Sequence, residues 1–379
     1  MPTTISPELA RRRLIEDDPV TVIDTRPAES FDEWHIPGAV NVPYTPGEDV
    51  DIGNTLDGAQ GDGDHVVTVC ALGQSSTAFA DELTAAGVGT VEVIQDGMIG
   101  WSRLYEVAAV PTALPSVEIF QVQRVAKGCL GYVIGAPEAG EAVIVDPTQH
   151  VDEFVRVAED DGLSITAVID THLHADHLSG GPALADAVDA PYHLPAPVAD
   201  RGVERPYTPL ARNDVLTVGD VELKGVHTPG HTTDQFSLLV ASEALLTADA
   251  VFVDGVGRTE LEEDARTGAR ELFDSIHRTV LAMPDAVQVL PGHFAPETTD
   301  AIRRTGTPIH TSVRKLRTEL PLLQQDRTAF IESITDTTVA QPPNYEQITA
   351  INRGTAELAD DEEARTLELG PNRCAAHQA

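Results

Sequence analysis

The sequence contains little cysteine, little lysine and no long apolar run. Its 379 residues include only three cysteines, Cys70, Cys129 and Cys374, which are far apart and form no CxxC pair. An odd number of widely spaced cysteines does not make a disulfide framework and fits a reducing compartment. No stretch approaches the roughly 20 apolar residues of a membrane span. The arginines at 11–13 are followed by acidic residues at 16–18 instead of the apolar run of a signal peptide, so we expect a cytoplasmic protein.

Positive charge is also scarce. Asp and Glu number 61 against 25 Lys and Arg, which gives a formal net charge of −36, and lysine occurs only at Lys127, Lys224 and Lys315. A surface of this charge would repel a nucleic acid. The acid is spread along the whole chain, which is typical of a solvated acidic surface in very high salt, where screening weakens self-repulsion. We therefore expect a halophilic environment, which concerns the setting and not the chemistry.

One short stretch, residues 171–177, concentrates possible metal ligands. It carries His172, His174, Asp176 and His177 in an H-x-H-x-D-H pattern. The β-branched and apolar residues 166–170 before it predict a buried strand, and the glycines after it lead into an alanine-rich helix. The four side chains therefore lie on a loop at the carboxyl end of a strand, a common place for chemistry. So many costly polar groups close together usually need a cation to hold them.

Three further ligand candidates follow strands at long spacing. His231 comes after a predicted strand of the hairpin that turns at Gly219 and Asp220, Asp249 ends the run 245–249, and His293 ends the run 287–293. A lone histidine is more often structural, and none of these residues is a strong signal alone. Strand ends on one side of a sheet can converge on a common point. The four strand ends together predict one metal centre.

The N-terminal third of the chain contains a candidate nucleophile, Cys70. Strands alternate with helices over residues 1–108, which predicts a parallel α/β sheet. Cys70 ends the strand 66–69 and precedes a helix, so backbone N–H groups there favour an anion and lower the pKa of the thiol. Position alone leaves two interpretations open, a nucleophilic thiolate or a buried inert cysteine.

Four motifs occur in order within residues 7–105: Asp24-Thr25-Arg26, His35-Ile36-Pro37-Gly38-Ala39, the loop Cys70-Ala71-Leu72-Gly73-Gln74-Ser75-Ser76, and Asp96-Gly97 with Trp101. Together they resemble a single-domain rhodanese. The resemblance implies that Cys70 carries a sulfane sulfur as a persulfide. Many rhodanese loops hold an arginine, whereas this loop has no cation. That departure favours transfer to or from a small thiol over an anionic donor such as thiosulfate.

The chain divides at a proline-spaced segment of small residues. Residues 109–116 predict a linker between a first domain at 1–108 and a second at 117–356. Residues 357–379 form an acidic C-terminal tail, which we expect to be disordered or loosely docked. Of the remaining cysteines, Cys129 is expected in the core and Cys374 is expected to be incidental.

The second domain resembles the metallo-β-lactamase superfamily, an αββα sandwich, over about residues 117–300. The resemblance implies one of two enzyme groups. Glyoxalase II hydrolases use two metals bridged by the residue matching Asp249. There one metal would take His172, His174 and His231, and the other would take Asp176, His177 and His293.

Persulfide dioxygenases are the other group, and they use one Fe(II). The resemblance places it on His172, His231 and Asp249, a 2-His-1-carboxylate face with open positions. His174, Asp176, His177 and His293 would then orient ligands or solvent. All seven residues are present, so ligand identity does not separate the two groups.

Neighbouring segments favour the dioxygenase. Residues 249–258, 271–277, 342–345 and 351–354 resemble the persulfide dioxygenase group. Within them Arg258 is a candidate for binding a substrate carboxylate bidentately, and Tyr345 is a candidate for the pocket wall.

The α/β chain is thus expected to be an iron-dependent persulfide dioxygenase with an N-terminal rhodanese. Its substrates would be a low-molecular-weight thiol persulfide and O₂, and relatives of this kind often form homo-oligomers. Two alternatives remain. One is a dinuclear zinc thioester hydrolase, and the other is a sulfur carrier whose metal site does not turn over.

Overall fold

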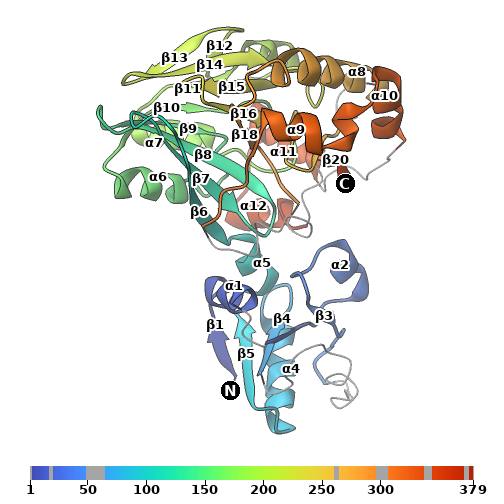
Figure 1. Cartoon of the computed structure of the whole chain (residues 1–379). Coiled ribbons are helices and arrows are strands. Elements are labelled where there is room, and N and C mark those ends of the chain that lie inside the picture. The colour runs from blue at the N-terminus through green and yellow to red at the C-terminus, as the bar shows by residue number, and fades with distance from the viewer. Residues whose placement is uncertain are drawn as a thin grey trace.

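The computed structural model describes residues 2–16, 20–47, 65–259, 264–295, 306–336 and 344–370, and the backbone of residues 375–378. Figure 1 shows two units, a smaller N-terminal one in blue to cyan and a larger one that contains the rest of the chain. Among the described residues, no helix combines the length and the apolar composition that crossing a bilayer requires.

The N-terminal unit is built on a five-stranded sheet in the order β1-β5-β4-β2-β3, and each neighbouring pair is parallel. Its strands are β1 (Thr3–Ile5), β2 (Thr21–Asp24), β3 (Val40–Asn41), β4 (His65–Val69) and β5 (Thr90–Ile94). Its helices are α1 (Pro7–Ile15), α2 (Ala28–Glu33), α4 (Gln74–Ala85) and α5 (Gly97–Ser102). The parallel α/β sheet expected from the sequence is confirmed, since the apolar strands alternate with helices that cover them.

The larger unit contains two mixed sheets. The first has the order β12-β11-β10-β9-β8-β7-β6 and the second the order β13-β14-β15-β16-β18-β19. The first comprises β6 (Tyr105–Val110), β7 (Glu118–Arg124), β8 (Cys129–Ala136), β9 (Glu141–Val145), β10 (Ser164–Ile169), β11 (Tyr192–Pro195) and β12 (Thr208–Leu210). The second comprises β13 (Val215–Val218), β14 (Val221–His227), β15 (Phe236–Val240), β16 (Ala244–Ala248), β18 (Gln288–Pro291) and β19 (Thr311–Ser312).

Helices cover the outer face of each sheet. The helices α6 (Val151–Asp160) and α7 (Gly181–Val188) pack on the first sheet, and their apolar faces form one cluster with it. The helices α8 (Ala265–Ser275), α9 (Val313–Glu319) and α10 (Arg327–Thr335) form a second cluster on the other sheet. The largest cluster lies between the two sheets and continues into the N-terminal unit. The αββα sandwich is therefore confirmed (Figure 1).

The boundary between the units differs from the sequence-based one. The strand β6 pairs with β7 from Tyr105 to Val110, so the second unit begins before the predicted linker at 109–116. Ala108 and Val110 are buried in the sheet, and only the segment around Pro111 and Pro115 connects strands. The small residues suggested a flexible linker, but here they fit a covered strand.

The two units are in direct contact. The indole nitrogen of Trp34 donates to the carbonyl of Ala126 at 3.1 Å, and the backbone N–H of Val125 donates to the carbonyl of Leu104 at 3.0 Å. The turn between β7 and β8 therefore docks against the N-terminal unit. Figure 1 shows α5 and α12 (Asp361–Leu367) near this junction.

The C-terminal segment is docked, and the expectation of a loose tail is wrong for residues 361–370. Glu368 is only 2% exposed and forms an ion pair with Arg124 in β7 at 2.5 Å. Lys127 donates to the carbonyls of Glu368 and Gly370. The segment therefore supplies acceptors for two buried cations, Arg124 and Lys127, which lie more than 200 residues earlier in the sequence. The local composition of the segment does not reveal this pairing. Cys374 lies outside the described residues.

Candidate metal centre and reactive cysteine

The strands β10, β14, β16 and β18 bring the predicted ligands to one edge of the larger unit. The residues after β10, 171–178, are called the metal loop below. All seven predicted ligands are buried, with exposed fractions between 0 and 4%: His172, His174, Asp176, His177, His231, Asp249 and His293. They fall into adjoining groups, each close enough to share an ion.

The first group is His172, His231 and Asp249. The Nε2 atoms of His172 and His231 lie 3.9 and 3.4 Å from Oδ2 of Asp249. Atoms that share one cation at about 2 Å lie roughly 3 to 3.5 Å apart, so a small contraction would complete the site. Within the described residues, Nε2 of His172 and Oδ2 of Asp249 have no hydrogen-bond partner. Buried polar atoms are rarely left without one, and an ion would satisfy both.

The protonation states of this group suit a cation. Burial lowers the pKa of His172 well below its usual value, and it lowers the pKa of His231 as well. Burial alone would raise the pKa of Asp249, but the neighbouring His293 and His231 hold it below the usual range. Two neutral imidazoles and one carboxylate are the forms that bind a divalent ion.

The ring of His174 is oriented by the carboxylate of Asp146. Its Nε2 atom lies 3.2 Å from Oδ1 of Asp146. Burial opposes a charge on the ring, but the hydrogen bond and charge of Asp146 raise the pKa of His174 to about 9. The other nitrogen, Nδ1, is buried without a hydrogen-bond partner among the described residues. A ring with this pKa carries a proton on both nitrogens at neutral pH, so Nδ1 could bind a cation only after losing its proton.

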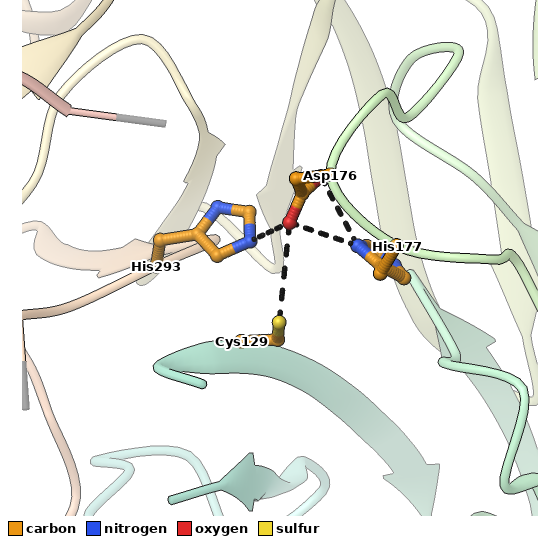
Figure 2. Close-up of side chains that lie close together, drawn as sticks. All are labelled: Cys129, Asp176, His177 and His293. Atoms are coloured by element: carbon orange, nitrogen blue, oxygen red, sulfur yellow. Dashed lines mark hydrogen bonds and ion pairs between the residues drawn. The ribbon is translucent and has the colours of Figure 1, made fainter. Parts of the chain in front are cut away.

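The second group contains a residue that sequence reasoning placed only in the core. Figure 2 shows Cys129, Asp176, His177 and His293 around one carboxylate oxygen. Oδ2 of Asp176 lies 3.0 Å from Nε2 of His293, 3.2 Å from Nδ1 of His177 and 4.0 Å from Sγ of Cys129. A thiol on this oxygen makes Cys129 part of the centre.

A sequence signal for Cys129 did exist. It is the first residue of β8, which is antiparallel to β9, whereas β9 is parallel to β10. The start of β8 therefore lies at the edge where β10 ends. Cys129 also forms an isolated bridge with His293, which brings the two sheets together at the centre.

His293 links the two groups. Its Nδ1 atom lies 2.6 Å from Oδ1 of Asp249, while its Nε2 atom faces Asp176. One oxygen of Asp249 is therefore used by His293, and the other faces His172 and His231.

Two glycines allow close approach to Asp249. A Cβ atom on Gly257 would lie 1.9 Å from the carbonyl oxygen of Asp249, and one on Gly292 would lie 2.7 Å from its Oδ1 atom. Real Cβ atoms do not come this close, so both positions require glycine.

The two predicted substrate-binding residues lie in different surroundings. Arg258 is fully buried, and its carbonyl accepts a hydrogen bond from Nδ1 of His231 at 2.8 Å, which orients that ring. Tyr345 begins α11 (Tyr345–Arg353), is half-buried, and directs its hydroxyl to Glu346. Among the described contacts, none joins Tyr345 to a predicted metal-ligating residue. Both substrate-binding roles stay predictions.

Three distant residues that sequence reasoning missed hold the backbone of the metal loop. Asp234 accepts from the N–H of Leu173 at 2.8 Å, and Glu368 accepts from the N–H of Leu178 at 2.7 Å. Asn352 donates to the carbonyls of His174 and His177, both at 2.9 Å. Nothing in the local sequence around these residues indicates such contacts.

Cys70 lies in the N-terminal unit between β4 and α4. Its Sγ atom accepts from the N–H of Gly73 at 3.0 Å and from the hydroxyl of Ser76 at 3.3 Å. Burial would raise the pKa of Cys70, but hydrogen bonds from Ser75, Ser76 and the backbone lower it below its usual value. A lowered pKa makes the thiolate available for nucleophilic attack.

The arginine of the Asp24-Thr25-Arg26 motif does not serve the cysteine. Arg26 forms an ion pair with Asp24 at 2.7 Å and donates to the carbonyl of Trp34. The residues that directly stabilise the sulfur are therefore neutral, as the loop sequence predicts.

Two regions of the chain match known families. Residues 6–104 match the Rhodanese-like domain, and residues 126–293 match the Metallo-beta-lactamase superfamily. Over 167 residues, 43% of this chain, the sequence is 34% identical to a hydroxyacylglutathione hydrolase of a Polaromonas species and spans 60% of it. It is 25% identical over 166 residues, also 43% of this chain, to the mitochondrial persulfide dioxygenase ETHE1 of Mus musculus and spans 62% of it.

A solved structure agrees with these matches. The crystal structure of ETHE1 from Myxococcus xanthus superposes with a TM-score of 0.55 at 27% identity, and it covers 62% of this chain and 98% of that one. The chain spans less than two thirds of the length of either of these relatives. The chain joins a rhodanese-like domain to a domain of the metallo-β-lactamase superfamily.

Proposed function

We propose that the chain is a persulfide dioxygenase that holds one Fe(II) and acts on a low-molecular-weight thiol persulfide. The overall reaction is R–S–SH + O₂ + H₂O → R–SH + SO₃²⁻ + 2H⁺, in which the terminal sulfur is oxidised and O₂ is reduced. The proposed iron ligands are His172, His231 and Asp249, and His174, Asp176, His177 and His293 orient them.

The position of His293 between Asp176 and Asp249 is the observation that carries this proposal. In a dinuclear centre Asp249 would serve both cations. Here its Oδ1 atom is held by His293 at 2.6 Å, and only Oδ2 faces the two other ligands. Two histidines and one carboxylate oxygen on one face are the ligand set of non-haem iron oxygenases.

Bound Fe(II) would supply adjacent open positions for the persulfide sulfur and O₂, so that the reactants meet already oriented. The protein residues orient the metal-ligating rings and limit the access of water. Asp146 and the carbonyl of Arg258 fix the rings of His174 and His231. The burial of all seven predicted ligands keeps bulk water away from the reacting sulfur.

The rhodanese-like domain would handle the sulfane sulfur through Cys70. The Cys70 thiolate attacks the outer sulfur of a donor persulfide R–S–SH. The bond between the two donor sulfurs breaks, R–S⁻ leaves as a thiolate, and Cys70 becomes a persulfide. Passing that sulfur to sulfite restores Cys70 and gives thiosulfate. The support for this role is the lowered pKa of Cys70 and the neutral hydrogen-bond donors around its sulfur.

A dinuclear zinc thioester hydrolase is the second candidate. The identity of 34% to a hydroxyacylglutathione hydrolase favours it, as does the complete set of seven ligands. It would hold two zinc ions and cleave an acyl-thiol without O₂.

The deciding experiment is O₂ uptake by protein purified without air, in molar salt, with a thiol persulfide as substrate and bound metal counted on the same sample. The dioxygenase predicts about one iron per chain and uptake that Cys70→Ser leaves intact. Two zinc ions per chain and no uptake would contradict it and favour the hydrolase.

A cytoplasmic location, a halophilic setting and a homo-oligomer stay predictions.

A further inference from the structure

Glu368 is a buried carboxylate in a chain whose acid is mostly exposed. Its Oε2 atom pairs with Nη1 of Arg124 at 2.5 Å and accepts from the amide of Gln149. Burial would raise the pKa of Glu368, but Arg124 and Lys127 lower it to about 2. The side chain therefore carries a full negative charge at neutral pH.

The second oxygen of Glu368 points at the metal loop. Its Oε1 atom accepts from the backbone N–H of Leu178 at 2.7 Å. Leu178 follows His177 directly, and the carbonyl of His177 accepts from Asn352 at 2.9 Å. The last peptide groups of the metal loop are thus held from two C-terminal residues, and irregular backbone of this kind depends on such partners.

Arg124 connects the same carboxylate to the rhodanese-like domain. Arg124 is 1% exposed, and its Nε atom donates to the carbonyl of Ser102 at 2.8 Å. Ser102 ends α5, and near the start of α5 the N–H of Met98 donates to the carbonyl of Cys70 at 2.8 Å. One short helix and one ion pair therefore lie between the cysteine loop and the metal loop.

We propose that Glu368 is a positioning residue of the metal centre, whose carboxylate is held in place by the buried ion pair with Arg124. Glu368 fixes the backbone that carries Asp176 and His177 and so sets where these side chains lie. The inference rests on the metal centre of the proposed function but not on the reaction that the centre performs.

A purely structural ion pair would behave differently. Replacing both partners of a buried pair with neutral groups often leaves stability unchanged, whereas removing one partner leaves a costly unpaired charge. The hydrogen bond to Leu178, in contrast, needs an acceptor at position 368 whether or not that acceptor is charged. Charge and acceptor can therefore be separated by substitution.

Two double variants make this separation. Arg124→Met with Glu368→Gln removes both charges but keeps an amide oxygen for Leu178, while Arg124→Met with Glu368→Leu removes the acceptor as well. The measurements are urea unfolding and Co(II) binding by chelator competition, with the Co(II) absorption spectrum recorded on each folded protein. Co(II) reports the ligand arrangement without any turnover, so the result does not depend on whether the enzyme oxidises persulfides.

We expect the leucine double variant to bind Co(II) about tenfold more weakly than the glutamine double variant and to show an altered spectrum, as happens when partners that orient ligands are lost. Glu362→Gln, on the exposed face of α12, is the matched control and should bind as the unsubstituted protein does. Equal affinity and equal spectra for the two folded double variants would overturn the proposal. If the leucine variant does not fold, Glu368→Asp serves instead, since it keeps the charge but withdraws the acceptor from Leu178.

Discussion

The Cys70 loop and the metal loop both follow a buried strand, but they are held in place differently. Hydrogen bonds to the sulfur of Cys70 come from Gly73 and Ser76, three and six residues further along the chain. The metal loop is held by Asp234, Asn352 and Glu368, which are 61 to 190 residues away. The first centre is a local structure, whereas the second exists only when the whole larger unit and the C-terminal segment are folded.

This difference has a chemical counterpart. A loop that stabilises one thiolate needs donors for a single charge, and a strand–loop–helix turn provides them within a few residues. A metal centre needs several ligands around one point, which no short stretch can supply, so strand ends from both sheets contribute. Substitutions in the cysteine loop should therefore alter only the sulfur-transfer step. Substitutions at positions far from the metal loop in sequence should nevertheless change metal binding.

The largest expected effect tests whether the two centres act independently. His231→Ala should remove a metal ligand and reduce bound iron and O₂ uptake by more than roughly 100-fold, since even partners behind a ligand are worth 10- to 100-fold. Formation of a persulfide on Cys70 should be unchanged, because its loop is local. The measurements are metal content, O₂ uptake and the mass of the alkylated protein. His310→Ala, at an exposed histidine outside the groups, is the control.

A substitution of Cys70 tests whether the metal centre depends on the rhodanese-like domain. Cys70→Ser should abolish persulfide on the rhodanese-like domain and thiosulfate formation, because the nucleophilic sulfur is gone. O₂ uptake with a free thiol persulfide should stay within about twofold of the unsubstituted protein, since no iron ligand changes. Loss of uptake would mean that the substrate reaches the metal only through Cys70, and the two centres would then form one path.

Local patterns predicted the ligands but not their supports. The strands before His172, Asp249 and His293 are runs of apolar residues, and a polar residue at the end of such a run is visible in the sequence. The same patterns predicted the alternating strands and helices of the N-terminal unit.

The supports could not be predicted because they join segments that only tertiary packing brings together. Glu368 looks like one more acidic residue of an acidic tail, and its partner Arg124 lies 244 residues earlier. Asn352 lies in a helix whose contact with the metal loop depends on both sheets being in place. The predicted linker at 109–116 overlaps β6 at residues 109 and 110, because small side chains fit a flexible segment as well as a covered strand.

A cation added to the cysteine loop should improve the use of an anionic sulfur donor. Gln74→Arg places a cation at an exposed position of the loop, and an arginine can bind an anionic donor bidentately. We expect the KM for thiosulfate in the sulfurtransferase reaction to fall roughly tenfold, the value of one charge-assisted hydrogen bond. Gln74→Leu is the uncharged control of similar size. A Gln74→Arg protein with an unchanged KM would show that the missing cation is not what limits the anionic donor.

The smallest effect concerns the pKa of Cys70. In the unsubstituted protein the hydroxyl of Ser76, 3.3 Å from the sulfur, helps to lower this pKa, so the thiolate forms at a lower pH than for an ordinary cysteine. Ser76→Ala removes the donor and should raise the pKa by roughly half to one unit, the worth of one hydrogen bond. Alkylation by iodoacetamide, followed across pH, should therefore slow near neutrality and become equal to that of the unsubstituted protein above both pKa values.

Thr84→Val is the control, since Thr84 lies on the same helix but its hydroxyl bonds to the carbonyl of Ala80, and this variant should leave the pH profile of alkylation unchanged. A profile that stays unshifted in Ser76→Ala would mean that the backbone N–H groups alone stabilise the thiolate. Because the metal loop takes no part in this local contact, metal content should be the same in all three proteins.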